Sequence, residues 1–441
     1  MPATPQSIDL LIESRWLIPV EPHGVVLEDH AVAIERGAIV AVLPQAQARL
    51  LYAPRERVEL AQHALIPGLV NAHTHNAMCL MRGIADDLPL MEWLQSHIWP
   101  AEARVLSAEY VRDGVELAVA EMLRGGTTCC NENYFFPDVQ AATYRRLGFR
   151  AMVGLPVIEF PTPWAASRDE YFEKGLAVHD EYRGEALIGT ALAPHAPYTV
   201  SDASFERIRV LSDQLDLPVH LHLHETNQEI EDSRREHGVR PFARIQSLGL
   251  VNDHLIAVHM TQLADAEIAA CAEAGVSVVH CVESNLKLAS GFCPAGKLRR
   301  AGVNLAIGTD GCASNNDLDM LGEMRSAALV AKAVAGDARA LDAASALRAA
   351  TLGGAHALGW GARIGSIEPG KQADLAAIRL DALETQPLYD VTSQIVYAAG
   401  RQQVSDVWIA GIRKLRERVL VDLDAVELVD TARRWRERLA P

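Results

Sequence analysis

The chain of 441 residues is 49% hydrophobic and 22% charged, a composition ordinary for a globular protein with a sizeable core. Its formal net charge of −16 argues against nucleic acid or an anionic membrane as a partner, and no apolar run is long enough to cross a bilayer. Seven cysteines without a CxxC pair, and an N-terminus without a basic region followed by an apolar core, indicate a cytoplasmic protein with buried thiols.

The first 64 residues have the pattern of short strands. "DLLIESRWLIPV" and "HAVAIERGAIVAVLP" are rich in β-forming residues, and Arg36-Gly37 predicts a hairpin turn. From Leu65 the pattern changes to apolar strands followed by amphipathic helices. The first long helix is predicted from Ser107 to Arg124, ended by Gly125-Gly126, and "TTCCNENY" follows as the next strand.

Further apolar runs follow, with helical segments between them: "ALIGTALAPH", "LPVHLHLHE", "HLIAVHM", "GVSVVHC" and "GVNLAIGTD". This alternation predicts a parallel sheet with crossover helices. Polar residues lie at or just past the ends of these strands, where (β/α)₈ barrels build their active sites: His75, His195, Glu225, His259 and Asp310. A doubly wound sheet would instead need a glycine-rich phosphate loop, and the sequence has none.

Strands return in "IGSIEPGKQADLAAIRL" and "VSDVWIAGIRKLRERVLV", and a last helix is predicted near Asp424 to Leu439. We therefore expect an α/β fold with a (β/α)₈ TIM barrel over residues 65–364. Residues 1–64 and 365–441 are expected to form the two parts of a small β-sandwich domain, with the terminal helix attached to the second part.

Two histidines in "LIPGLVNAHTHNAMCL" predict a metal site. Because side chains alternate along a strand, His73 and His75 point the same way and can grip one ion. Further donors lie at later strand ends: one of the histidines of "VHLHLHE", then His259 and Asp310. Histidines and a carboxylate suit zinc, and iron or manganese would accept the same set. The spacing leaves open which of His220, His222 and His224 is the ligand.

Several motifs together resemble the amidohydrolase superfamily: "PGLVNAHTH", "HLHE", "GTDGCASNN" and "GSIEPGKQADL". More narrowly, "RGIADDLPLMEWL", "PHAPYTVS" and "SNLKLASG" resemble the 5-methylthioadenosine/S-adenosylhomocysteine deaminases and their adenosine-deaminating relatives. The resemblance covers about residues 8 to 420. It implies a distorted barrel that holds a metal ion, a two-part β-sandwich and hydrolytic deamination of a purine nucleoside.

The resemblance also assigns roles to residues. The metal ligands would be His73, His75, His222 and Asp310, with Glu225 as proton shuttle and His259 orienting the attacking water. Asp310 would also take a proton from that water, and Glu92 and His195 would contact the sugar side of the substrate. Members of the superfamily with two metals use a lysine of the fourth strand. "ALIGTALAPH" contains none, so one divalent ion is expected, with zinc favoured.

The expected partner is thus a small purine nucleoside, and the family implies a homo-oligomer. The rival enzyme function is a deaminase or chlorohydrolase of the same superfamily that acts on guanine, a pterin or a triazine. Such an enzyme would keep the metal ligands and Glu225 but would not need Glu92. A metal-stabilised binding protein that has lost catalysis is a rival from another class, and the presence of both Glu225 and Asp310 argues against it, since a passive site needs no proton shuttle. Trp93 and Trp99 could line the pocket or only pack a helix.

Overall fold

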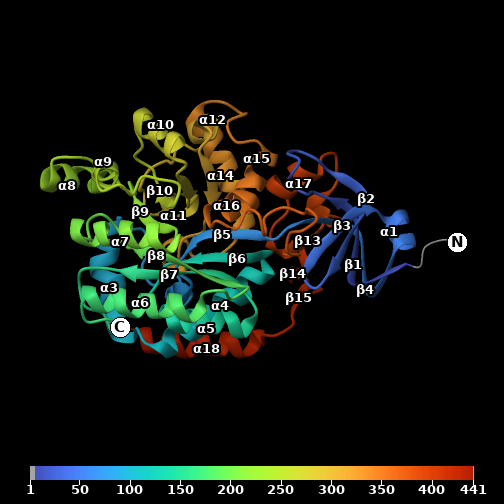
Figure 1. Cartoon of the computed structure of the whole chain (residues 1–441), viewed down its shortest axis with the longest axis horizontal. Helices are drawn as coiled ribbons and strands as arrows, with labels where there is room; N and C mark the ends of the chain where they lie inside the picture. Colours follow the sequence, from blue (N-terminus) through green and yellow to red (C-terminus); the bar gives the residue numbers. More distant parts are fainter. Residues whose placement is uncertain (1–4, 441) are drawn as a thin grey trace.

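The structure, a computed structural model, describes residues 5–440. Eight parallel strands form the predicted barrel at its centre (Figure 1). They are hydrogen-bonded in chain order, and their bounds are β5 Leu69–Thr74, β6 Thr127–Glu132, β7 Arg150–Val157, β8 Ile188–Pro194, β9 Val219–Leu223, β10 Leu255–His259, β11 Ser277–His280 and β12 Asn304–Ile307. The strands are buried on both faces, which explains why most of them are largely apolar in the sequence.

The barrel closes where the segment after β12 meets β5. The Asp310 N–H donates to the His73 carbonyl oxygen (3.0 Å), and the side chain of Asn71 pairs with Thr309 through two hydrogen bonds. A Cβ at Gly308 would lie 2.7 Å from the backbone nitrogen of His73, so only glycine permits this approach. The seam therefore brings the first and last barrel strands, with their polar residues, side by side.

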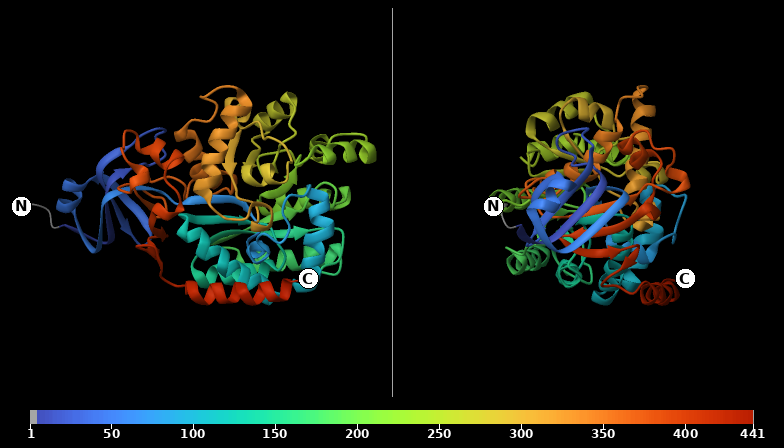
Figure 2. Two further views of the ribbon diagram at one scale, coloured as in Figure 1. Left: turned by 180° about the vertical axis from the view of Figure 1, so that it is seen from behind. Right: turned by 90° about the vertical axis from the view of Figure 1, so that its right-hand side faces the viewer.

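Helices surround the barrel (Figure 2). The predicted helix after residue 107 is α4, Ala108–Arg124, and Ser107 caps it by accepting from the Tyr110 N–H. The other connecting helices are α5 Pro137–Leu147, α6 Arg168–Tyr182, α7 Asp202–Leu215, α8 Asn227–His237, α9 Pro241–Ser247, α10 Asp265–Ala274, α11 Val282–Lys287, α12 Ala295–Arg300, α13 Cys312–Asn315, α14 Met320–Ala335, α15 Ala343–Arg348, η3 Ala349–Gly353 and α16 Gly354–Ala357.

The segment between β5 and α4 contains only short helices: η1 Asn76–Met81, α2 Leu90–Trp93, η2 Leu94–Ile98 and α3 Trp99–Val105. Residues of α2, η2 and α3 line one cavity together with the ends of the barrel strands. This segment therefore forms part of the wall of the site.

The two ends of the chain combine, as predicted, into a separate β unit beside the barrel (Figure 1). Its strands form one continuous sheet because β4 pairs with β1 on one side and with β13 on the other. In sheet order the strands are β16 Val419–Leu420, β15 Ile412–Arg416, β14 Val404–Ile409, β13 Leu375–Arg379, β4 Tyr52–Pro67, β1 Gln6–Leu17, β2 Leu27–Glu35 and β3 Ala38–Pro44. The Arg36-Gly37 turn is confirmed, with both residues at positive φ. The helices of these end segments are α1 Gln45–Leu51, η4 Leu383–Thr385, α17 Val391–Tyr397 and η5 Arg401–Gln403.

The terminal helix α18, Ala425–Leu439, leaves this sheet and packs on the barrel beside α4 (Figures 1 and 2). The Trp435 indole N–H donates to Asp113 (2.9 Å), and its ring packs edge-on against Tyr110. Between residues 5 and 440, none of the helices combines the length and apolarity that a membrane span requires.

Candidate metal and substrate site

Four side chains from three barrel strands converge on one point at the carboxyl end of the barrel. His73 lies near the end of the first strand, β5, and His75 directly follows that strand. His222 lies on the fifth strand, β9, and Asp310 follows the eighth strand, β12. Asp310 Oδ1 lies 3.2 Å from Nε2 of His73 and 3.2 Å from Nε2 of His75. The Nε2 atom of His222 lies 3.2 Å and 3.3 Å from the same two nitrogens. Ligands about 2.0–2.1 Å from one tetrahedral ion are about 3.3 Å from one another, so this spacing fits a divalent metal.

The outer ring nitrogens fix the tautomers of two histidines of this cluster, His75 and His222. Nδ1 of His222 lies 2.6 Å from the carbonyl oxygen of His195, and Nδ1 of His75 bonds to the carbonyl oxygen of Asn133. A carbonyl oxygen only accepts hydrogen bonds, so each Nδ1 carries the proton and each Nε2 keeps a lone pair. Lone pairs that converge on a carboxylate oxygen need a cation between them. The donor set therefore fits the predicted metal.

Asp310 is held in a strained but well-supported position. Its backbone φ is +62°, in the left-handed region, and its Oδ2 accepts from the hydroxyls of Ser284 (2.6 Å) and Ser314 (2.9 Å). His259, which ends the sixth strand, has φ +73°. Non-glycine residues in this region are costly and cluster at functional sites, where the surrounding structure enforces them.

Glu225 and His259 lie next to the cluster as a pair. The Glu225 Oε2 is 3.8 Å from Nε2 of His259, whose Nδ1 lies 2.9 Å from Oδ1 of Asn285. Glu229 accepts from the Glu225 backbone N–H (2.7 Å) at the start of α8, which fixes the turn after the fifth strand. Burial raises the pKa of the Glu225 carboxyl above its ordinary value, so its neutral form is more populated than that of an exposed glutamate.

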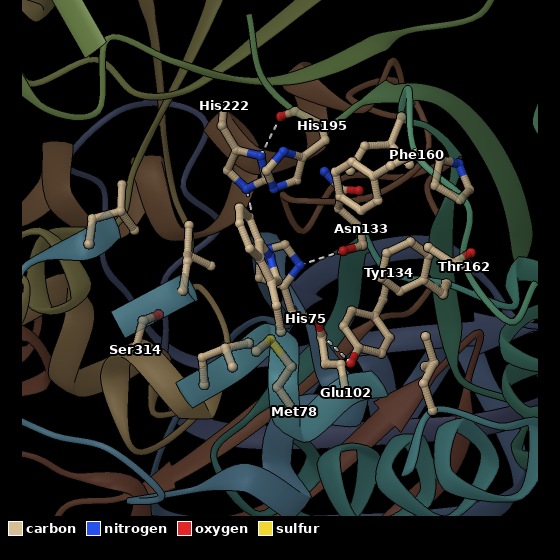
Figure 3. A pocket seen from close by; sticks show the side chains of 18 of the residues that line it. His75, Met78, Glu102, Asn133, Tyr134, Phe160, Thr162, His195, His222 and Ser314 are labelled. Atoms are coloured by element: carbon tan, nitrogen blue, oxygen red, sulfur yellow. Dashed lines mark hydrogen bonds between the residues drawn. The ribbon is translucent and has the colours of Figure 1, made fainter. Parts of the chain in front are cut away.

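A cavity of about 260 Å³ opens from the cluster (Figure 3). Its lining includes six of the residues singled out from the sequence: His75, His195, His222, Glu225, His259 and Asp310. Trp93 and Trp99 also line it, and both pack against the hydrophobic core as well, so each alternative considered for them describes part of their role. His73 lies fully buried behind the other ligands. The structure thus brings together all the residues of the predicted site except one.

That exception is Glu92. It is exposed on α2 and is absent from the described residues that line the cavity, whereas its neighbours Leu90, Trp93 and Leu94 are present. The expectation that Glu92 contacts the substrate is therefore not met, because this short helix turns the flanking apolar residues inward and leaves Glu92 in solvent.

Within the segment between β5 and α4, the carboxylate that does line the cavity is Glu102 on α3, which the sequence reasoning missed (Figure 3). The Tyr134 hydroxyl donates to it (2.5 Å), and burial raises its pKa to about 7. A signal was present in the sequence: Leu94, Ile98, Glu102 and Leu106 recur every four residues, and all four line the cavity. An acid on an apolar helical stripe is unusual and indicates a role.

The three histidines of "HLHLHE" occupy three different depths. His220 lies below the cluster, with Nε2 2.8 Å from Nδ1 of His73, and His222 lies level with the cluster. His224 turns away at φ +54°, and its Nε2 accepts from the Phe242 N–H. Only His222 can therefore place a nitrogen beside His73, His75 and Asp310.

Comparisons with known proteins agree with this geometry. The sequence model described as "Amidohydrolase family" matches residues 64–413. The chain is 48% identical over 433 residues to a 5-methylthioadenosine/S-adenosylhomocysteine deaminase of Teredinibacter turnerae, covering 98% of both chains. It is 67% identical to an adenosine deaminase from Xanthomonas campestris crystallised with bound zinc, with a TM-score of 0.98 and 99% of both chains covered. It shares its fold with an atrazine chlorohydrolase from Arthrobacter aurescens at 23% identity and a TM-score of 0.90, covering 97% of this chain and 99% of the other.

Proposed function

This chain belongs to the amidohydrolase family, and we propose that it hydrolytically deaminates an adenine nucleoside: 5-methylthioadenosine, S-adenosylhomocysteine or adenosine. The observation that carries the proposal is the position of Glu225, a buried acid in the cavity that opens from the four-donor metal set. Such an acid has no use in a passive metal site. The relatives named for these activities match this chain over nearly its whole length.

The residues that would hold the metal are His73, His75, His222 and Asp310, and we propose one zinc ion per chain. When bound, such an ion polarises water and lowers its pKa from about 15.7 toward roughly 7. The fourth barrel strand, β8, has the sequence "IGTALAP" and offers no lysine to bridge a second ion. A single metal is therefore proposed.

The proton transfers belong to the side chains. We propose that Asp310 accepts a proton from the attacking water and that Glu225 donates one to N1 of the adenine ring, which makes C6 electrophilic. His259, oriented by Asn285, would hydrogen-bond the tetrahedral centre formed at C6. Water adds to C6, the amino group leaves as ammonia, and the 6-oxo nucleoside remains.

Glu102 takes the role that the sequence suggested for Glu92. The 2′- and 3′-hydroxyls of a ribose are neighbouring donors, and one carboxylate can accept from both. Glu102 lines the cavity and lies outside the metal cluster, so it is available to a sugar while Glu225 faces the base. His195, at the end of the fourth strand, also lines this cavity, with Nδ1 bonded to Thr199 (2.9 Å).

An ammonia-release assay tests the proposal. The metal-loaded protein should deaminate 5-methylthioadenosine and adenosine with kcat/KM far above the values for adenine and guanine. Protein treated with a chelator should show only background release on every compound. Turnover of guanine or adenine with none of the nucleosides would replace the proposal by a free-base deaminase, and no ammonia from any of the compounds would refute it.

A further inference from the structure

The aromatic part of the cavity can favour one group on C5′ of the nucleoside over another. Building on the proposed function, we propose that Trp99 and Phe160 form a subsite for the group on C5′ of the nucleoside. This subsite selects an uncharged apolar group such as a methylthioether and discriminates against one that ends in an amino acid. The two aromatic residues would thus determine specificity without taking part in the chemistry.

The position of the subsite follows from α3. Trp99 and Glu102 are three residues apart on this helix, so they lie on the same face, about 4.5 Å apart along its axis. A ribose whose hydroxyls bond to Glu102 has its C5′ a few bonds from those hydroxyls, so the C5′ group falls within reach of Trp99. The Phe160 ring packs edge-on against Trp99 with ring centroids 6.1 Å apart. In Figure 3, Phe160 and Ser314 lie on opposite sides of His75.

The two rings offer apolar surface that a ligand can cover. Phe160 lies in the segment after β7, is 38% exposed and lines the cavity, and Trp99 is partly buried. Their neighbours in the lining are Phe135, Ile158, Pro161 and Pro163. A methylthio group placed here would leave water and contact only carbon-rich surface, which favours binding.

The same wall lacks partners for charge. Within residues 5–440 no lysine or arginine lines this cavity, so a substrate carboxylate would find no cation there. The adjoining cavity shares Leu90 and Tyr198 with it and contains Arg244. The guanidinium of Arg244 is already committed to Asp202 and to the carbonyl oxygens of Pro197 and Val200. Taking a charged amino-acid group out of water without an ion partner is costly.

The direct test compares the wild-type protein on three nucleosides. We expect kcat/KM for 5-methylthioadenosine to exceed that for S-adenosylhomocysteine by about a hundredfold or more, because the charged group lacks partners. Values within threefold of each other would overturn the subsite and leave the deaminase proposal intact. Failure on all three, adenosine included, would instead refute the proposed function.

Substitutions of Phe160 test whether this residue determines the preference for an apolar C5′ group. Phe160→Ala should lower the ratio of kcat/KM for 5-methylthioadenosine to that for adenosine by about tenfold, because only the first substrate carries an apolar C5′ group. Phe160→Arg should raise the ratio for S-adenosylhomocysteine to 5-methylthioadenosine. Phe292→Ala, at a phenylalanine that is 54% exposed and outside the cavity lining, is the matched control and should change neither ratio. Thermal melting should show that each variant folds, and unchanged ratios in both Phe160 variants would refute the assignment.

Discussion

Oδ1 of Asp310 lies 3.2 Å from Nε2 of His73, although 237 positions separate the two residues in the chain. The contact exists because the segment after β12 meets β5 at the closure of the barrel, where the Asp310 N–H also bonds to the His73 carbonyl oxygen. The metal site and the closed barrel are therefore formed together. Binding of an ion at this seam should stabilise the whole barrel, because the unfolded chain has no such site.

The first prediction concerns metal content. The purified protein, loaded with zinc, should contain one equivalent per chain. His222→Ala should lose it and lower kcat/KM by more than about a hundredfold, since even residues behind metal ligands matter by 10- to 100-fold. His23→Ala, at an exposed histidine of the terminal sheet region, should retain both metal and activity. Elemental analysis that finds two tightly bound ions in the site would contradict the single-metal assignment.

The second prediction separates proton transfer from metal binding. Glu225→Gln should keep its zinc, because Glu225 lies outside the four-donor set, and should lose about 10²–10⁴-fold in kcat. Asp310→Asn should lose both metal affinity and rate. The control is Glu231→Gln, at an exposed glutamate of α8. Elemental analysis combined with steady-state kinetics decides. A Glu225→Gln enzyme that turns over at the wild-type rate would remove Glu225 from the mechanism.

The third prediction distinguishes Glu102 from Glu92. Hydrogen bonds to a charged group are worth roughly 1.5–3 kcal/mol, so Glu102→Ala should lower kcat/KM for a nucleoside by about ten- to a hundredfold or more. Glu92→Ala should have no effect, because Glu92 is exposed outside the cavity. Any weak activity on adenine should be the same in both variants. If Glu92→Ala were the damaging substitution, the ribose contact would have to be reassigned to it.

The fourth prediction is a pH dependence. Burial raises the pKa of Glu102 to about 7, against an ordinary value of 4.5, so this carboxyl becomes neutral as the pH falls through about 7. The ionised form accepts from the ribose hydroxyls through stronger, charge-assisted hydrogen bonds than the neutral form. The ratio of wild-type kcat/KM to that of Glu102→Gln should therefore rise with pH, with a midpoint near 7. Titration of Glu225 is common to both enzymes and cancels in the ratio. A ratio that stays flat from pH 5.5 to pH 8.5 (about three units around the pKa) would contradict the role.

Ionisation of Glu102 should favour substrate binding but lower the stability of the fold. Because the folded pKa of Glu102 is raised above its unfolded value, its ionisation costs stability once the pH exceeds the unfolded pKa, and the cost is complete above the folded one. Glu102→Gln should therefore raise the melting temperature relative to wild type at pH 8 more than at pH 4. An equal shift at both pH values would show that the carboxylate is not destabilised by burial.

The sequence by itself determined the architecture and most of the chemistry. Buried parallel strands must be apolar, so any polar residue at their carboxyl ends stands out, and His75, His195, Glu225, His259 and Asp310 could be found in this way. Side-chain alternation was enough to pair His73 with His75. These are local properties of a strand, which depend little on the rest of the fold.

Only the tertiary structure decided what depends on depth and direction. Alternation places His220, His222 and His224 on the same face, but in the folded barrel only His222 has its Nε2 beside the Nε2 atoms of both His73 and His75. The choice between Glu92 and Glu102 likewise depends on how the segment between β5 and α4 wraps over the barrel, since both lie on short helices rich in apolar residues. Spacing along the chain specifies which side chains share a face. Which face is buried is set by packing against distant segments, and that information appears only when the chain has folded.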